Sequence, residues 1–283
     1  AFDADTLVHL AHARGDAIIR AGGDDLGAMA AVNAGPQAVS AALPDNSGVT
    51  LANMNAPEQT VIAGPTDAIM AVLPVLELAG LAAKRLPVAC GFHSDCVAPA
   101  KDLLAGALDA AAISAPSLPV IGNATAAPYG DNADSVRAQL ASHLTDPVNF
   151  TGGIEALYER GVRLFLEIGP GAVLARLSDR ILGDREHLSL SADMKGRPGA
   201  QQLLCLLGGA MAAGLPLNLA RVFEGRVEAK IDVKTWDLSE APDPRRAMKW
   251  MIDAANARPI DGQPARRGFA ARIEEDPVSQ PER

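Results

Sequence analysis

The segment from residue 26 to residue 88 alternates extended and helical patterns in an order that strongly restricts the fold. Apolar and β-branched runs bounded by turn residues predict strands, and apolar residues at three- or four-residue spacing predict helices. The expected strands are 26–34, 48–55, 59–64 and 82–88, and the expected helices are 36–43 and 65–80. The order β-α-β-β-α-β is that of the ferredoxin-like, or split βαβ, unit.

Helical and extended patterns continue to alternate on both sides of this segment. Helices are expected at 4–20, 97–111, 133–144, 153–161 and 172–182, and strands at 118–125 and 162–171. Such alternation indicates a parallel sheet covered by helices. We expect residues 1–24 and 89–222 to form this larger α/β domain, with residues 25–88 inserted into it. Residues 223–283 are rich in Pro, Arg and acidic residues, which predicts an inter-domain linker.

Charge and cysteine content argue against several classes of function. The net charge of −9 argues against general binding to nucleic acid or to an anionic membrane. No uninterrupted apolar run is long enough to span a bilayer. The three cysteines, Cys90, Cys96 and Cys205, are too few for a disulfide framework and form no zinc-type motif. A cytoplasmic protein without a bound metal is therefore expected.

The stretch Phe92-His93-Ser94 follows the last strand of the βαββαβ segment, where loops commonly present catalytic groups. An imidazole there could act as a base near neutral pH, although on position alone a structural or surface histidine is more common. Cys90 and Cys96 flank it, but inert buried thiols are more common than a Cys–His pair. Ser94 is a poor partner, because adjacent side chains on an extended backbone point apart.

The first helix carries three further polar candidates. His9 and His12 lie three residues apart, a spacing possible for metal ligands, but no carboxylate or cysteine constellation supports such a site, so a solvated helix face is expected. Arg14 would also face water unless an anion must be held, for which its planar fork is suited. The chain contains no GxSxG, GxGxxG or P-loop motif.

Six stretches, taken in order and spacing, point to one family. They are LAHARGDAI, VTLANMNAPEQTVIAGP, VACGFHSD, PVIGNAT, HLTDPVNF and LFLEIGPGAVL. Over residues 1 to about 190 the chain resembles the malonyl-CoA:acyl carrier protein transacylase family. It resembles more closely the acyltransferase domains of type I polyketide and fatty acid synthases.

This resemblance implies a fold and a reaction. The fold is an α/β-hydrolase-like large subdomain, here partial, with a ferredoxin-like insert, which agrees with the element order found above. In the reaction, a serine takes an acyl group from coenzyme A and passes it to the phosphopantetheine thiol of an acyl carrier protein. Malonyl-CoA is then a substrate, no cofactor is bound, and the partners are the carrier protein and neighbouring synthase domains such as a ketosynthase.

The resemblance also assigns roles to individual residues. His93 matches the histidine that activates the serine, and Arg14 matches the arginine that pairs with the free carboxylate of a malonyl-type extender. His143 matches the residue whose backbone carbonyl orients the catalytic imidazole. A backbone acceptor can fix the tautomer as the acid of a triad does.

The tetrapeptide at 90–93, CGFH, occupies the place of the family's specificity motif. Phe92, at its third position, resembles malonyl-selective members, because a bulky ring would exclude a methyl branch at the α-carbon. The preceding Cys-Gly departs from the usual malonyl pattern. Asn53 and Asn55 match positions that line the family's cleft.

The largest departure from the family concerns the nucleophile. The Gly-His-Ser-x-Gly elbow of the family lies roughly two dozen residues before the arginine that Arg14 matches. Only thirteen residues precede Arg14, so we expect the serine to lie outside this chain and the chain alone to be inactive. Two alternatives remain open: a noncatalytic acyltransferase-like scaffold or docking domain, and an unrelated ferredoxin-like binding module.

Overall fold

The computed structural model describes residues 2–21, 23–224, 250–252 and 257–259. The chain divides into two units, Ala1–Leu217 and Asn218–Arg283. In the second unit, α9 (Ala220–Phe223) is a short helix, and β7 (Trp250–Ile252) pairs antiparallel with β8 (Ala257–Pro259). The rest of the expected linker at 223–283 lies outside the described residues.

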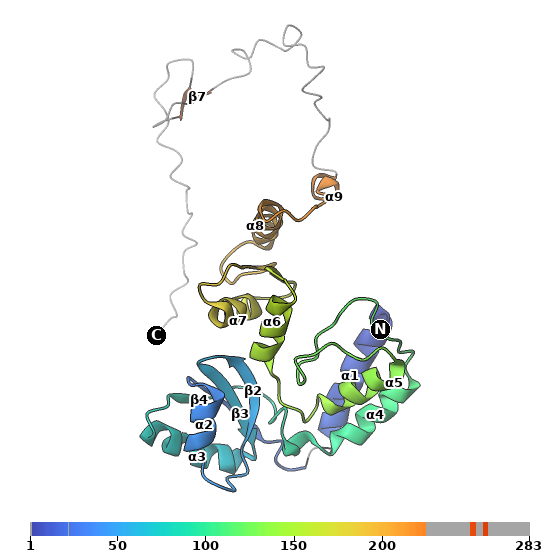
Figure 1. Cartoon of the computed structure of the whole chain (residues 1–283), viewed down its shortest axis with the longest axis vertical. Coiled ribbons are helices and arrows are strands. Elements are labelled where there is room, and N and C mark those ends of the chain that lie inside the picture. The colour runs from blue at the N-terminus through green and yellow to red at the C-terminus, as the bar shows by residue number, and fades with distance from the viewer. Residues whose placement is uncertain (1, 22, 225–249, 253–256, 260–283) are drawn as a thin grey trace, which may run out of the picture. The chain divides into compact units, whose positions relative to one another are not determined.

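A four-stranded antiparallel sheet forms the centre of the segment at residues 26–88. Its strands are β1 (Ala28–Val32), β2 (Thr50–Ala56), β3 (Gln59–Gly64) and β4 (Ala83–Arg85), in the order β2-β3-β1-β4. Helices α2 (Pro36–Ala42) and α3 (Thr66–Leu78) cover one face (Figure 1). The predicted element order is confirmed, and β1 and β4 are shorter than expected.

The two faces of this sheet belong to different cores, because successive side chains of a strand point to opposite faces. On the helix-covered face, Ala30, Val32 and Ile62 are fully buried with residues of α2 and α3. On the opposite face, Met29 and Val61 belong to a second buried cluster. That second face forms one wall of the cleft described below.

Three helices form a separate layer. They are α1 (Ala4–Ala21), α4 (Ala100–Ala110) and α5 (Ala133–Ser142), which lie together in Figure 1. Leu10 and Ile18 of α1 share a buried cluster with Leu104 of α4 and Val136 of α5. Within the described ranges, no helix is both long and apolar enough to cross a membrane.

A parallel pair of strands follows, β5 (Leu164–Glu167) with β6 (Leu188–Ser191). The elements around it are α6 (Phe150–Glu159), α7 (Val173–Leu182) and α8 (Gly199–Ala212). The helices α6 and α7 match the prediction, whereas β6 and α8 were not anticipated. In the described part of the chain, β5 and β6 are the only parallel strand pair, and the sheet of β1 to β4 is antiparallel. The structure therefore shows an α/β fold that contains both parallel and antiparallel strands.

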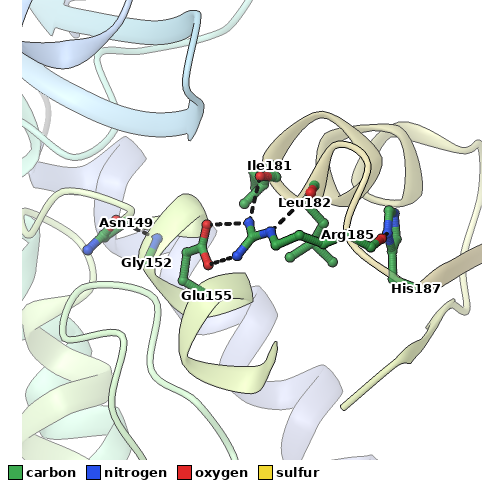
Figure 2. A network of polar contacts seen from close by, with 7 residues as sticks. All are labelled: Asn149, Gly152, Glu155, Ile181, Leu182, Arg185 and His187. Atoms are coloured by element: carbon green, nitrogen blue, oxygen red, sulfur yellow. Dashed lines mark hydrogen bonds and ion pairs between the residues drawn. The ribbon is translucent and has the colours of Figure 1, made fainter. Parts of the chain in front are cut away.

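An arginine network joins α6 to the turn after α7 (Figure 2). The Arg185 guanidinium donates two hydrogen bonds of 2.7 Å to the Glu155 carboxylate. It also donates to the carbonyls of Ile181 and Leu182, at 2.9 and 3.0 Å. Because those carbonyls end α7, a single planar side chain both closes that helix and fixes it to α6.

The strand expected at 118–125 is not formed. Ile121 makes a single bridge to Pro128, and the Gly122 N–H donates to the Ala127 carbonyl at 2.8 Å. The stretch therefore turns back on the residues that follow it instead of joining β5 and β6. An apolar run predicts an extended backbone, but a strand also needs a neighbour to which its backbone groups can bond.

Candidate active site

His93 lies in the turn that follows β4, in a strained backbone conformation. Its φ angle is +58°, in the left-handed region that residues other than glycine rarely adopt. The backbone N–H donates to the Leu144 carbonyl at 3.1 Å, and Nδ1 lies 2.9 Å from the Asp146 carbonyl oxygen. A carbonyl can only accept, so Nδ1 carries the proton and Nε2 is left as the basic nitrogen.

The carbonyl hydrogen-bonded to Nδ1 of His93 is that of Asp146, whereas the resemblance implied an orienting role for the His143 carbonyl. After α5 the chain turns, with the N–H groups of Thr145 and Asp146 both donating to the Ser142 carbonyl. This turn brings the Asp146 carbonyl to Nδ1. The His143 carbonyl also acts on His93, but it raises the pKa of His93 less than the Asp146 carbonyl does.

Burial lowers the pKa of His93 below its ordinary value, and this effect outweighs the two carbonyls, which raise it. The positive charge of Arg14 lowers the pKa further. The imidazole is therefore held neutral at pH 7. A neutral imidazole with a free Nε2 is the form that a general base requires.

Arg14 projects from α1 into the same region. Its Cζ lies 5.9 Å from the centre of the Phe92 ring, within the range of a cation–π contact. Its side chain is half-buried, and among the described residues it has no hydrogen bond or ion pair to a carboxylate. A partly buried guanidinium without an anionic partner can receive an anion from solution.

Two adjoining cavities share Arg14 and His93. The larger, about 410 Å³, lies against the sheet, where Asn53, Asn55 and Phe92 also line it. The smaller, about 120 Å³, is lined in addition by the polar groups Asn123, His143 and Asp146. The structure thus brings together the residues to which the sequence assigned a site role.

The segment around Val148 connects the His93 turn to the sheet. Val148 exchanges two hydrogen bonds of 2.8 Å with β2, through the Met54 N–H and the Ala52 carbonyl. The next residue, Asn149, donates its N–H to the Asn123 carbonyl at 2.7 Å. The residues that orient His93 are therefore anchored to both sides of the cleft.

The other candidate nucleophiles near His93 are engaged elsewhere. Ser94 is 4% exposed, and its hydroxyl donates to the Gly91 carbonyl at 2.6 Å while accepting from the Cys96 N–H at 3.3 Å. It therefore caps the short helix that follows. Cys90 is 1% exposed, and burial raises the pKa of its thiol, so it stays protonated and unreactive. No group of three potential metal ligands occurs among the described residues.

Tyr129 contacts the site residue His143, and the sequence did not reveal this contact. Its hydroxyl lies 3.3 Å from Nε2 of His143, and the two rings meet edge to face. Burial lowers the pKa of His143, and this outweighs the Asp146 carboxylate, which raises the pKa; His93 and Arg14 lower it by smaller amounts. Tyr129 lies in an irregular loop, where no periodic pattern could have indicated its direction.

These two neutral histidines predict an acid-sensitive fold. Because their pKa values are lower in the folded chain, the unfolded chain takes up protons first when the pH falls below about 6.5. The free energy of unfolding should therefore decrease between pH 7.5 and 5.5, measured by urea denaturation. The His93→Gln/His143→Gln double variant should show a smaller decrease in this free energy than wild type. The His9→Gln variant, changed at an exposed position, should show the same decrease as wild type. Equal pH dependence in all three proteins would refute this.

Comparison with known proteins agrees with the geometry. The model of the family described as acyl transferase domain matches residues 4–195. The chain is 35% identical over 193 residues to the polyketide biosynthesis protein ThaF of Burkholderia thailandensis, covering 68% of this chain and 17% of that protein. It is 33% identical over 200 residues to the malonyl CoA-acyl carrier protein transacylase of Escherichia coli K12, covering 68% and 62%.

A solved structure shows the same similarity in three dimensions. The acyltransferase domain from the second module of the salinomycin polyketide synthase has a TM-score of 0.70 and 30% identity, covering 80% of this chain and 53% of that chain. The chain thus spans less than two thirds of the length of each of these relatives. Because the family model matches more than half of its residues, the chain belongs to the acyl transferase domain family.

Proposed function

We propose that this chain carries the general base and the acyl-binding groups of an acyltransferase of a polyketide or fatty acid synthase. The reaction moves a malonyl-type group from coenzyme A to a serine, and then to the phosphopantetheine thiol of an acyl carrier protein. The observation that carries the proposal is the cleft shared by Arg14 and His93. The Arg14 guanidinium there, which has no ion pair among the described residues, adjoins the neutral imidazole of His93, whose Nε2 is free. The name of the E. coli relative supports the same donor and acceptor.

His93 performs the proton transfers in this scheme. Nε2 takes the proton of the serine hydroxyl as its oxygen attacks the thioester carbon, and returns that proton to the departing coenzyme A thiolate. The Asp146 carbonyl at Nδ1 holds the ring in the required tautomer and stabilises the transient imidazolium. In the second half-reaction the phosphopantetheine thiol gives up its proton to the same nitrogen as its sulfur attacks the acyl-serine carbon, and the departing serine oxygen takes that proton back.

Arg14 and Phe92 select the acyl group. The guanidinium binds the free carboxylate of a malonyl group, and the adjacent ring narrows the space beside the α-carbon. Discrimination of one methyl group by packing amounts to about 1–3 kcal/mol. Malonyl-CoA is therefore the proposed donor.

The nucleophile belongs, in this proposal, to a segment outside the 283 residues, which contain no GxSxG motif. Incubation of this chain with malonyl-CoA should therefore give no covalent adduct in intact-protein mass spectrometry. Ser94 and Cys90 are both buried. The Ser94 hydroxyl is hydrogen-bonded to the backbone, and the Cys90 thiol is protonated, as described above. A family member with a GxSxG motif serves as the positive control. A mass increase equal to one malonyl group on this chain would contradict the prediction.

The proposed organisation follows from the same resemblance. Residues 1–24 and 89–222 are assigned to an α/β-hydrolase-like large subdomain, and residues 25–88 to a ferredoxin-like insert. Residues 223–283 are proposed to link this part to neighbouring synthase domains such as a ketosynthase. The acyl carrier protein is the proposed transient partner, and the cytoplasm the proposed location.

A further inference from the structure

The cleft-facing side of the sheet is covered mainly by small side chains. Ala52 and Ala63 are fully buried there, and Ala31 packs against them. Met29 is the largest side chain of that buried cluster and is 5% exposed. It also lines the larger cavity. One flexible side chain on β1 therefore fills space that its alanine neighbours leave open.

Phe92 contacts both this cluster and Arg14. Its side chain packs against the cluster that contains Met29, and also against the helical core that contains Leu10. The Arg14 Cζ lies 5.9 Å from the centre of its ring. How far the ring extends toward Arg14 therefore depends on the volume of the side chains that support it from the sheet.

The backbone holds Met29 firmly at this position. Met29 pairs with Ala63 in the register of β1 and β3, and its carbonyl accepts from the Leu86 N–H at 2.8 Å. Leu86 lines the same cavity and packs on the same cluster. Removing the Met29 side chain would leave a gap that the fixed strands cannot close.

We propose that Met29 is a specificity-determining residue, which acts through Phe92 to set the width of the acyl pocket beside Arg14. The inference rests on the proposed function and adds a selectivity determinant on β1, outside the CGFH tetrapeptide. With Met29 in place, Phe92 is held toward Arg14 and a malonyl group fits. With a smaller residue, the ring can recede toward the sheet and admit an α-branched malonyl thioester.

The test measures binding to the 283-residue chain itself, so that no nucleophile is required. The chain is labelled with ¹³C at its methionine methyls and titrated with malonyl-pantetheine and with 2-methylmalonyl-pantetheine. The ¹⁵N-labelled backbone amides of Asn53 and Asn55, which line the larger cavity, serve as the reporters in every variant. In wild type we expect the Met29 methyl signal to shift on binding. We expect Met29→Ala to lower the preference for malonyl over methylmalonyl about tenfold, the scale of one methyl group in an apolar pocket.

Two variants separate selectivity from loss of structure. Met29→Leu restores most of the volume and should restore the preference. Ile62→Ala removes a comparable buried side chain from the helix-covered face of the same sheet and should leave the preference unchanged. An unchanged preference in Met29→Ala, or an equal change in Ile62→Ala, would overturn the inference.

A third variant, Arg14→Ala, tests the proposed function separately. It should abolish binding of both thioesters if Arg14 holds their carboxylate. If binding persists in Arg14→Ala while Met29→Ala still changes the preference, the carboxylate role is wrong and the pocket inference stands. Absence of malonyl-pantetheine binding to the wild-type chain would overturn both.

Discussion

Replacing His93 with alanine, in a domain that also supplies the serine, should slow acylation by malonyl-CoA by about 10²- to 10⁴-fold. The loss is large because the substitution removes the imidazole whose Nδ1 is hydrogen-bonded to the Asp146 carbonyl and whose Nε2 is left free as the base. Single-turnover acylation, followed by quenched-flow mass spectrometry, measures the chemical step directly.

His9→Ala provides the matched control for this experiment. His9 is an exposed histidine on α1, so its loss should leave acylation unchanged. The acylation rate of the wild-type domain should keep its plateau value as the pH falls just below 6.5, because burial lowers the pKa of His93 and keeps Nε2 unprotonated. A loss of less than tenfold in His93→Ala would show that another group acts as the base.

Arg14→Ala should lower kcat/KM for malonyl-CoA by about 10²- to 10⁴-fold while changing that for acetyl-CoA little. A hydrogen bond to a charged group contributes about 1.5–3 kcal/mol, and the malonyl carboxylate would lose two such bonds in a bidentate pair. The acetyl donor has no carboxylate and so loses nothing comparable. Steady-state transfer to an acyl carrier protein with each donor gives the ratio.

Arg20→Ala, on the same helix, is the control for Arg14→Ala. Its side chain is 74% exposed and, among the residues that the structure describes, pairs only with Asp16, at 3.7 Å, so transfer from both donors should be unaffected. Equal losses for acetyl- and malonyl-CoA in Arg14→Ala would argue against a carboxylate-binding role and for a structural one.

The part of the fold with local sequence signals could be predicted. The order of the elements from β1 to β4 followed from alternating periodicity, and the bounds of β3 were predicted correctly as 59–64. The same reasoning failed at 118–125, where an apolar run has no strand partner. It also missed β6 and Tyr129, whose surroundings come from distant parts of the chain.

The sequence by itself determined that an α/β unit ends just before His93 and that Arg14 lies on an amphipathic helix. Both follow from local periodicity, which is a property of neighbouring residues. Only the tertiary structure decided that the Asp146 carbonyl, 53 residues away in the chain, orients the imidazole. Only it placed Met29 and Phe92 in the same cluster beside the cavity. Such contacts depend on how turns and layers pack, and that geometry is set by long-range burial and hydrogen bonding, which no local pattern records.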